Sequence, residues 1–134
     1  GSPQSVVTAT ELATVKNSLD QIAKSGGANG KSFINALNTN KPLEIILNSS
    51  GGNTAYRGLF KMTVDLSTHI NIRKPLSRMG ITRLIAHEGA HAVLGYSDWP
   101  YSLNTTVNFV DGIMKGINGS VRGDYYNVCH PGNC

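Results

Sequence analysis

Long apolar runs are missing from this 134-residue chain. No stretch approaches the roughly 20 consecutive apolar residues that a helix needs to cross a bilayer, so we expect no membrane span. Charge is also sparse. Charged residues make up 15% of the chain and hydrophobic residues 40%, which is typical of a globular domain rather than a disordered one. The length suits one domain over residues 1–134 and is short for two.

The basic residues give a net charge of +4 without forming a continuous run. The nearest approach to a cluster is Arg73-Lys74 with Arg78 and Arg83, and no aromatic residues are interleaved with it as they are in nucleic-acid-binding surfaces. We therefore expect no nucleic-acid partner. A nucleic-acid-binding domain is kept as an alternative that only the net charge suggests, and a strongly salt-dependent affinity for DNA or RNA would support it.

The two ends of the chain look irregular. No charged-then-apolar signal peptide opens it, and residues 1–4, GSPQ, resemble a cloning scar and the disordered start of an excised domain, so a secretion signal could lie outside this sequence. Residues 127–134 are predicted to form an irregular tail. Its cysteines, Cys129 and Cys134, either close a small disulfide loop, as in an oxidising compartment, or stay as two thiols. His130 lies between them, but one short loop rarely supplies a complete set of metal ligands.

Hydrophobic periodicity predicts helices, then strands, then helices. A capping-box pattern from Thr8 to Glu11 opens a first amphipathic helix that runs to Gly26-Gly27. The remaining predictions are a short helix over 31–38, strands over 42–48, 60–66 and 69–72, a loop over 48–56, a helix over 77–94 that Gly95 ends, a loop over 97–104 and a helix over 105–117. This order predicts an α+β fold with a small mixed sheet.

The segment AHEGAHAVLGYSD, residues 86–98, contains the residues that predict a metal site. Residues four apart share one face of a helix, so His87 and His91 point the same way from neighbouring turns. Two imidazole nitrogens so placed can bind one Zn²⁺, and Glu88 lies close enough to touch a water on the metal without ligating it. In such H-E-x-x-H hydrolases the zinc acidifies water and polarises a carbonyl while the glutamate carries the proton.

A catalytic zinc needs a third protein ligand, and two aspartates are candidates. Asp98 follows the helix-ending Gly95, where a reversal of the chain can bring its carboxylate back toward the histidines. Asp111 lies on the apolar face of the last predicted helix and is the alternative ligand, or a hydrogen-bond partner of a zinc-bound histidine. We favour Asp98 as the ligand. The single His69, on a predicted strand, is more typical of a structural histidine.

Residues 87–98 read H-E-x-x-H-x-x-x-G-x-x-D, which resembles the zincin effector proteases that bacteria inject into host cells. The segment is also similar to the metallopeptidase toxin domains at the ends of bacterial polymorphic toxins. The resemblance implies a zincin-like fold, with the H-E-x-x-H helix supported by the C-terminal helix, and implies Asp98 as the third zinc ligand. It reaches at most from about residue 80 to 126.

The same resemblance extends to a tyrosine near the metal. The toxin domains have a region ending R-x-x-Y, which matches Arg122 and Tyr125 and implies that the Tyr125 hydroxyl donates toward a developing oxyanion. Tyr101 and Tyr126 are rivals for that role. The toxin domains often carry an acidic residue where this chain has Val107, so that position supplies no ligand here.

The sequence therefore predicts a zinc metalloprotease, secreted or delivered into a target cell as an effector or toxin, with a protein substrate. It is expected to be a monomer and to have a cognate immunity or inhibitor protein as a possible partner. The alternative is a zinc-stabilised binding domain without turnover. A fourth protein ligand such as His130 would favour that alternative, because it would close the coordination position that catalysis needs.

Overall fold

The computed structural model describes residues 7–39, 42–49, 52–67, 70–130 and 134. The predicted scar at residues 1–4 and the predicted structural role of His69 both lie outside the described residues. The described chain combines four α-helices with two small sheets, so the predicted α+β class is confirmed.

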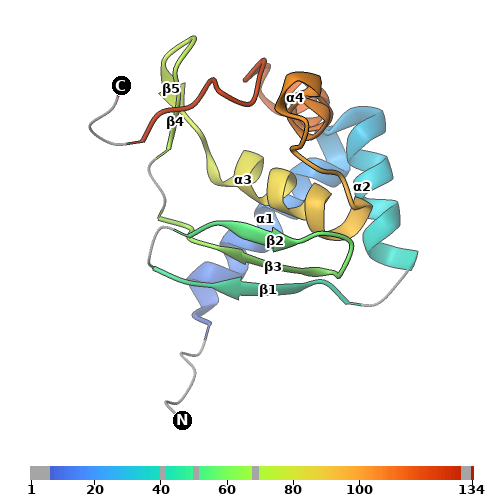
Figure 1. The fold of residues 1–134 in the computed structure, drawn as a ribbon. Coiled ribbons are helices and arrows are strands. Elements are labelled where there is room, and N and C mark those ends of the chain that lie inside the picture. Colours follow the sequence, from blue (N-terminus) through green and yellow to red (C-terminus); the bar gives the residue numbers. More distant parts are fainter. Residues whose placement is uncertain (1–6, 40–41, 50–51, 68–69, 131–133) are drawn as a thin grey trace.

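Two helices form the N-terminal part (Figure 1). Helix α1 (Ala9–Ser25) begins as predicted: the Thr8 hydroxyl accepts from the Glu11 N–H at 3.1 Å, and the Glu11 carboxylate accepts from the Thr8 N–H at 2.9 Å. Helix α2 (Gly27–Thr39) begins earlier than predicted. Gly27 has a φ of +66°, a left-handed conformation that turns the chain sharply from one helix into the next, so no loop separates them.

The main sheet has the order β1-β3-β2, with β1 (Glu44–Leu47) parallel and β2 (Thr54–Tyr56) antiparallel to the central strand β3 (Lys61–Val64). Strands β1 and β3 were predicted. The prediction of a continuous loop over 48–56 is wrong at β2, because three residues are too few to display a period-two pattern among the Gly, Asn and Ser that surround them.

A second, two-stranded sheet pairs β4 (Asn71–Ile72) with β5 (Ser77–Arg78). The predicted helix start at residue 77 is therefore wrong, because the backbone of residues 77–78 is used in this pairing and the helix begins only after Gly80. Asn71 also exchanges two backbone hydrogen bonds with Cys129, at 2.9 and 2.8 Å. These bonds tie the C-terminal segment to the sheet (Figure 1).

The segment that carries H-E-x-x-H runs through the middle of the molecule. Helix α3 (Ile81–Gly89) continues directly into a π-helical turn, η1 (Ala90–Leu94), and Gly95 at φ +73° ends it as predicted. A short 3-10 helix, η2 (Tyr101–Leu103), then leads into α4 (Thr105–Ile117).

Helix α3 packs between two hydrophobic clusters. On one side, Leu84 and Ile85 meet side chains from α1 and from the main sheet, including Met62 and Val64. On the other side, Ala86 meets side chains from α1, α2 and α4. The helix is consequently held by almost every other element of the fold, so its side-chain directions are fixed by packing. None of the described helices is long and apolar enough to cross a membrane.

Gly89, the last residue of α3, lies against the Phe33 ring of α2. A Cβ at this position would lie 2.5 Å from Cζ of Phe33, whose side chain is fully buried and has no space to turn away. We expect Gly89→Ala to lower the free energy of unfolding by about 1–3 kcal/mol through overpacking. Asn35→Ala, on the exposed side of α2, is the matched control and should stay within about 0.5 kcal/mol of the wild type. Urea unfolding measures both, and an unchanged stability for Gly89→Ala would contradict this packing.

Candidate metal centre

Three side chains that the sequence singled out meet at one point. The ligand atoms of His87, His91 and Asp98 all lie within 4.8 Å of one another, and among the described residues this is the one group of its kind. His87 is in the last part of α3, His91 is in the π-helical turn, and Asp98 lies beyond the reversal at Gly95. The imidazole rings of the two histidines meet edge to face, with their centroids 4.8 Å apart.

The Asp98 carboxylate bridges the two imidazoles. Its Oδ1 lies 3.4 Å from Nε2 of His87, and its Oδ2 lies 3.1 Å from Nε2 of His91. Ligands held at about 2.0–2.1 Å around a tetrahedral ion are about 3.3–3.4 Å apart, which is close to both separations. Oδ1 is buried without a hydrogen-bond partner. A buried carboxylate oxygen left without a partner is costly, and a cation between the three groups would satisfy it.

The other nitrogen of His91 is fixed by the backbone. Nδ1 lies 2.7 Å from the carbonyl oxygen of Tyr96, which can only accept, so Nδ1 carries a proton and Nε2 is the nitrogen that faces Asp98. Metal-binding histidines commonly donate to a carbonyl in this way, which fixes their tautomer and ring orientation. The geometry of this residue therefore fits a ligand.

The charges of the three groups are strongly coupled. Burial lowers the pKa of His87 below its ordinary value, which favours the neutral ring. Burial also acts against the charged form of His91, but its hydrogen bonds to Asp98 and to the Tyr96 carbonyl raise its pKa overall. Burial similarly disfavours a charged Asp98, yet the two histidines hold the pKa of this carboxyl well below its usual range. Asp98 is thus an anion in contact with two imidazoles.

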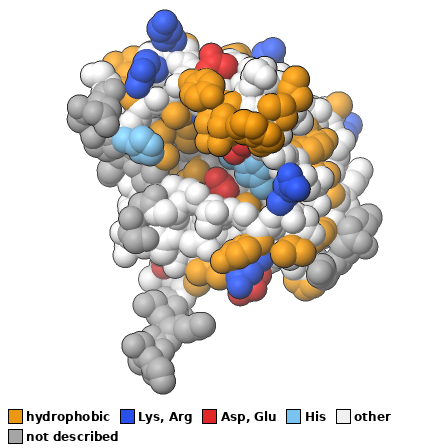
Figure 2. Space-filling model, viewed as in Figure 1, with side chains coloured by type: hydrophobic (Ala, Val, Ile, Leu, Met, Phe, Trp, Pro, Cys, Tyr) orange, Lys and Arg blue, Asp and Glu red, His pale blue; other side chains and the backbone are white. Residues whose placement is uncertain are grey.

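Glu88 lies beside the cluster and does not belong to it. Its side chain is buried, and burial raises its pKa to about 7. Glu88 lines hollows on both sides of the cluster: a cleft of about 480 Å³ that also contains His87 and Asp98, and a smaller groove that contains His91 and Asp98. In the space-filling view, acidic and histidine side chains lie in a hollow whose upper rim is hydrophobic (Figure 2).

Tyr125 and Arg122 form part of the wall of the larger cleft, so the structure brings the predicted R-x-x-Y pair to the cluster. The guanidinium of Arg122 is buried, donates to the Tyr125 carbonyl at 2.6 Å and lies 5.7 Å from the centre of the Tyr125 ring. Burial raises the pKa of the Tyr125 hydroxyl. Tyr126 lines the same cleft and is largely exposed, whereas Tyr101 stacks on the Tyr125 ring at 4.3 Å.

Asp111 is not part of the cluster, so the alternative of Asp111 as third ligand or as partner of a ligand histidine is not supported by the geometry. Its Oδ1 pairs with Nη1 of Arg83 at 2.7 Å and accepts from the Arg122 N–H at 2.8 Å, and its Oδ2 accepts from the Gly123 N–H at 2.9 Å. Arg83 also donates to Ser120. The buried Arg83–Asp111 pair thus anchors the segment that carries Arg122 and Tyr125.

From the C-terminal side, Val128 and His130 line the larger cleft. Cys129 and Cys134 are joined by a disulfide, which resolves the alternative that the sequence left open. His130 lines the larger cleft from an exposed position and is not one of the three clustered groups. The start of the C-terminal segment is held by the Asn127 side chain, which bonds to the backbone of Lys74 at 2.9 and 3.0 Å.

The sequence did not indicate how the end of the helix is held. In the π-helical turn, the carbonyls of His91 and Ala92 accept from the N–H groups of Gly58 and Phe60, at 2.9 and 3.0 Å. These donors lie in the turn between β2 and β3, so the sheet and the ligand-bearing turn are joined directly. Bulges of this kind often occur at functional sites. The contact between the Tyr96 carbonyl and His91 could not be predicted either, because every residue has a backbone carbonyl and the residue type does not show which one is used.

One strand edge lies beside the cluster. It belongs neither to β3, which is central in the main sheet, nor to β4, whose Asn71 is paired on both sides. Strand β2 is instead the edge beside the cluster, because Thr54 and Ala55 line the smaller groove together with Glu88 and His91.

No protein-family model, curated protein or solved structure matches this chain.

Removing Asp111 tests the structural role that its contacts define. We expect Asp111→Ala to lower the free energy of unfolding by about 3–5 kcal/mol, because it leaves the buried Arg83 without its counter-ion. Asp124→Ala, an exposed change in the same C-terminal segment, should cost much less. Chemical unfolding followed by circular dichroism compares the two. A loss below about 1 kcal/mol for Asp111→Ala would contradict this assignment.

Proposed function

We propose that this chain is a zinc-dependent endopeptidase that acts on a protein substrate. The observation that carries the proposal is the convergence of His87, His91 and Asp98 on one point, with an orphaned carboxylate oxygen and a His91 ring whose orientation a backbone carbonyl fixes. Two histidines and a carboxylate form a ligand set that suits zinc. Three protein ligands, with Glu88 and His130 outside the cluster, leave a coordination position open, which favours turnover over a purely structural site.

The residues around this set have distinct roles in the proposed reaction. A zinc ion held by His87, His91 and Asp98 would supply a Lewis acid that acidifies water and polarises the substrate carbonyl. Glu88 takes the proton from the attacking water and delivers it to the leaving amine, for which its place between the two hollows is suitable. Tyr125, held by Arg122 and by Tyr101, donates from its hydroxyl toward the oxyanion that develops on the carbonyl.

Strand β2 offers a way to hold the substrate. An extended peptide can add to an exposed edge strand through backbone hydrogen bonds. Among the described strands, β2 pairs only with β3, and its Thr54 and Ala55 border the groove beside Glu88. We propose that the peptide lies along β2, which would align its backbone with the cluster without requiring a particular sequence.

The setting in which the protein acts is proposed from the resemblance of residues 87–98 to bacterial effector and toxin proteases. A secreted or delivered toxin domain, acting in a target cell and restrained in its producer by an immunity protein, is consistent with that resemblance. The Cys129–Cys134 disulfide supports passage through an oxidising compartment.

Metal analysis of the purified protein tests the ligand set. We expect about one zinc per chain in the wild type, and loss of stoichiometric zinc in His87→Ala and in Asp98→Ala, because each change removes one of three ligands. His130→Ala, which alters the same cleft outside the cluster, is the control and should retain zinc. A wild type that takes up no zinc, or an Asp98→Ala variant that retains it, would contradict the proposed site.

Turnover is tested by replacing the proton carrier. Glu88→Gln should retain zinc and lower peptide cleavage by about 10²–10⁴-fold, because the amide cannot accept the proton. Cleavage is measured as new amino termini that mass spectrometry detects in a mixture of unfolded proteins, so that no single substrate has to be chosen. Glu44→Gln, at an exposed position on β1, is the matched control. Full activity in Glu88→Gln would remove this residue from the proposed reaction.

A further inference from the structure

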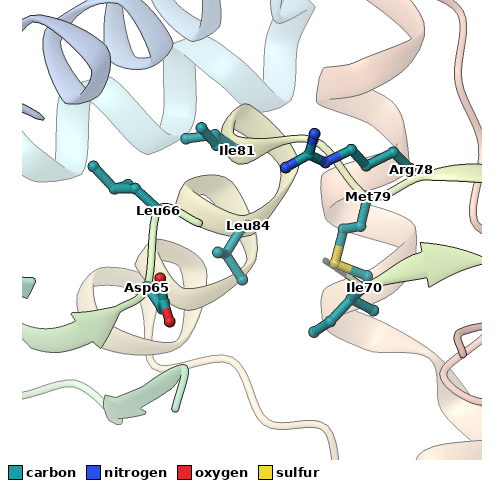
Figure 3. A pocket seen from close by; sticks show the side chains of 8 residues that line it. Asp65, Leu66, Ile70, Arg78, Met79, Ile81 and Leu84 are labelled. Atoms are coloured by element: carbon teal, nitrogen blue, oxygen red, sulfur yellow. The ribbon is translucent and has the colours of Figure 1, made fainter. Parts of the chain in front are cut away.

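Two hollows meet behind the candidate metal centre. Ile70, Met79 and Leu84 line the larger cleft, and the same three side chains line a second, small cavity of about 10 Å³. These three residues, which we call the partition, therefore lie between the cleft and this small cavity. Figure 3 shows the small cavity, with the Met79 side chain running toward Ile70 and with Leu84 between this pair and Leu66.

The partition and the cavity behind it are largely apolar. Leu66 and Ile81 complete the apolar lining. Two charged residues, Asp65 and Arg78, also border the cavity, and the Oδ1 of Asp65 accepts from the N–H and hydroxyl of Ser67 at 2.8 and 2.6 Å. The cavity has room for no more than about one water, so a large apolar side chain would lie in the cleft against the partition, where its removal from water favours binding.

Met79 is the movable member of the partition. Its backbone is fixed, because its N–H donates to the Ile70 carbonyl at 2.7 Å. Its side chain is unbranched, with three rotatable bonds, and is only half-buried. Leu84 is buried on α3 and so cannot move easily. A rotation of the Met79 side chain would thus join the cavity to the cleft without a change in the backbone.

The partition also lies next to the proposed reacting groups. Leu84 precedes His87 and Glu88 by three and four residues on α3, which places all three on neighbouring turns of the same helix. All three line the larger cleft. A side chain held against the partition therefore belongs to a substrate residue close to the bond that is cleaved.

The groove on the other side of Glu88 has a different character. Its lining is mostly polar and includes Thr54, Arg57 and Ser97, with Ala55 as its one apolar side chain. The two hollows therefore offer different surroundings to a substrate chain, and the large apolar side chains of the partition line only the larger cleft.

We propose that Met79 is the specificity-determining residue of this site, and that the partition selects peptides with a large apolar side chain next to the cleaved bond. Met79 sets the depth of the pocket, because its side chain separates the cleft from the cavity behind. This inference rests on the proposed function for the identity of the reacting groups, while the pocket itself rests on the contacts of the partition alone.

Methionine methyl signals allow a direct test, since the chain has three methionines. Met62 and Met114 are 0% and 4% exposed and serve as internal controls. In zinc-loaded protein with ¹³C-labelled methionine methyls, we would titrate peptide hydroxamates that carry leucine, aspartate or naphthylalanine beside the metal-binding group. We expect the leucine probe to bind about tenfold or more tightly than the aspartate probe and to shift the Met79 signal alone.

Two variants of Met79 complete the experiment. Met79→Ala should join the cavity to the cleft and raise the affinity of the naphthylalanine probe about tenfold relative to the leucine probe. Met79→Leu nearly conserves the volume of the side chain, so the probes should bind to it in the same order of affinity as to the wild type. The inference is overturned if a bound leucine hydroxamate leaves the Met79 signal in place, if aspartate binds as tightly as leucine, or if Met79→Ala keeps the wild-type order.

A metal-free arm separates this inference from the proposed function. Acetylated leucine peptide amides at millimolar concentration should shift the Met79 signal without zinc, whereas the aspartate peptides should not. If zinc and the hydroxamates fail to bind but the leucine peptides still shift Met79, the proposed function is wrong and the apolar pocket stands. If zinc and the hydroxamates bind but no peptide shifts Met79, the pocket is wrong and the metal centre stands.

Discussion

The reversal of the chain at Gly95 is the constraint on which the candidate site depends. Gly95 takes a left-handed conformation that glycine adopts without strain, and it directs the following residues back along the helix that they leave. The Tyr96 carbonyl then fixes one nitrogen of His91, and Asp98 places its carboxylate across the other nitrogen and that of His87. One turn thus supplies both the third candidate ligand and the group that orients the second.

A second constraint builds the opposite wall. The buried Arg83–Asp111 pair links α3 to α4, and the same carboxylate holds the backbone of Arg122 and Gly123. Because a carboxylate buried beside an arginine is costly to separate from it, the segment that follows α4 has a fixed path. That path brings Tyr125 to the cleft and leads on to the bridge between Asn71 and Cys129. An aspartate that the sequence offered as a metal ligand therefore acts as a structural anchor.

Much of this arrangement could be predicted from local patterns. The capping box of α1, the alternation of β3, the helix with His87 and His91 on one face and the stop at Gly95 all follow from spacing within a short window. What could not be predicted depends on contacts between distant segments. Strand β2 exists because Thr54–Tyr56 pairs with β3, and residues 77–78 form a strand because they pair with β4, so neither carries a sufficient pattern of its own. The partition could not be predicted for the same reason, because Ile70, Met79 and Leu84 come from three different segments of the chain.

The central claim, that two imidazoles and one carboxylate hold a zinc ion, is tested most directly by X-ray absorption at the zinc edge of the loaded protein. The account predicts a shell of nitrogen and oxygen at about 2.0–2.1 Å, with the outer-shell scattering of two imidazole rings and without sulfur at about 2.3 Å. A sulfur neighbour, or the signature of three or more imidazoles, would contradict it, because the ligands would then come from Cys129, Cys134 or His130 rather than from the reversal at Gly95.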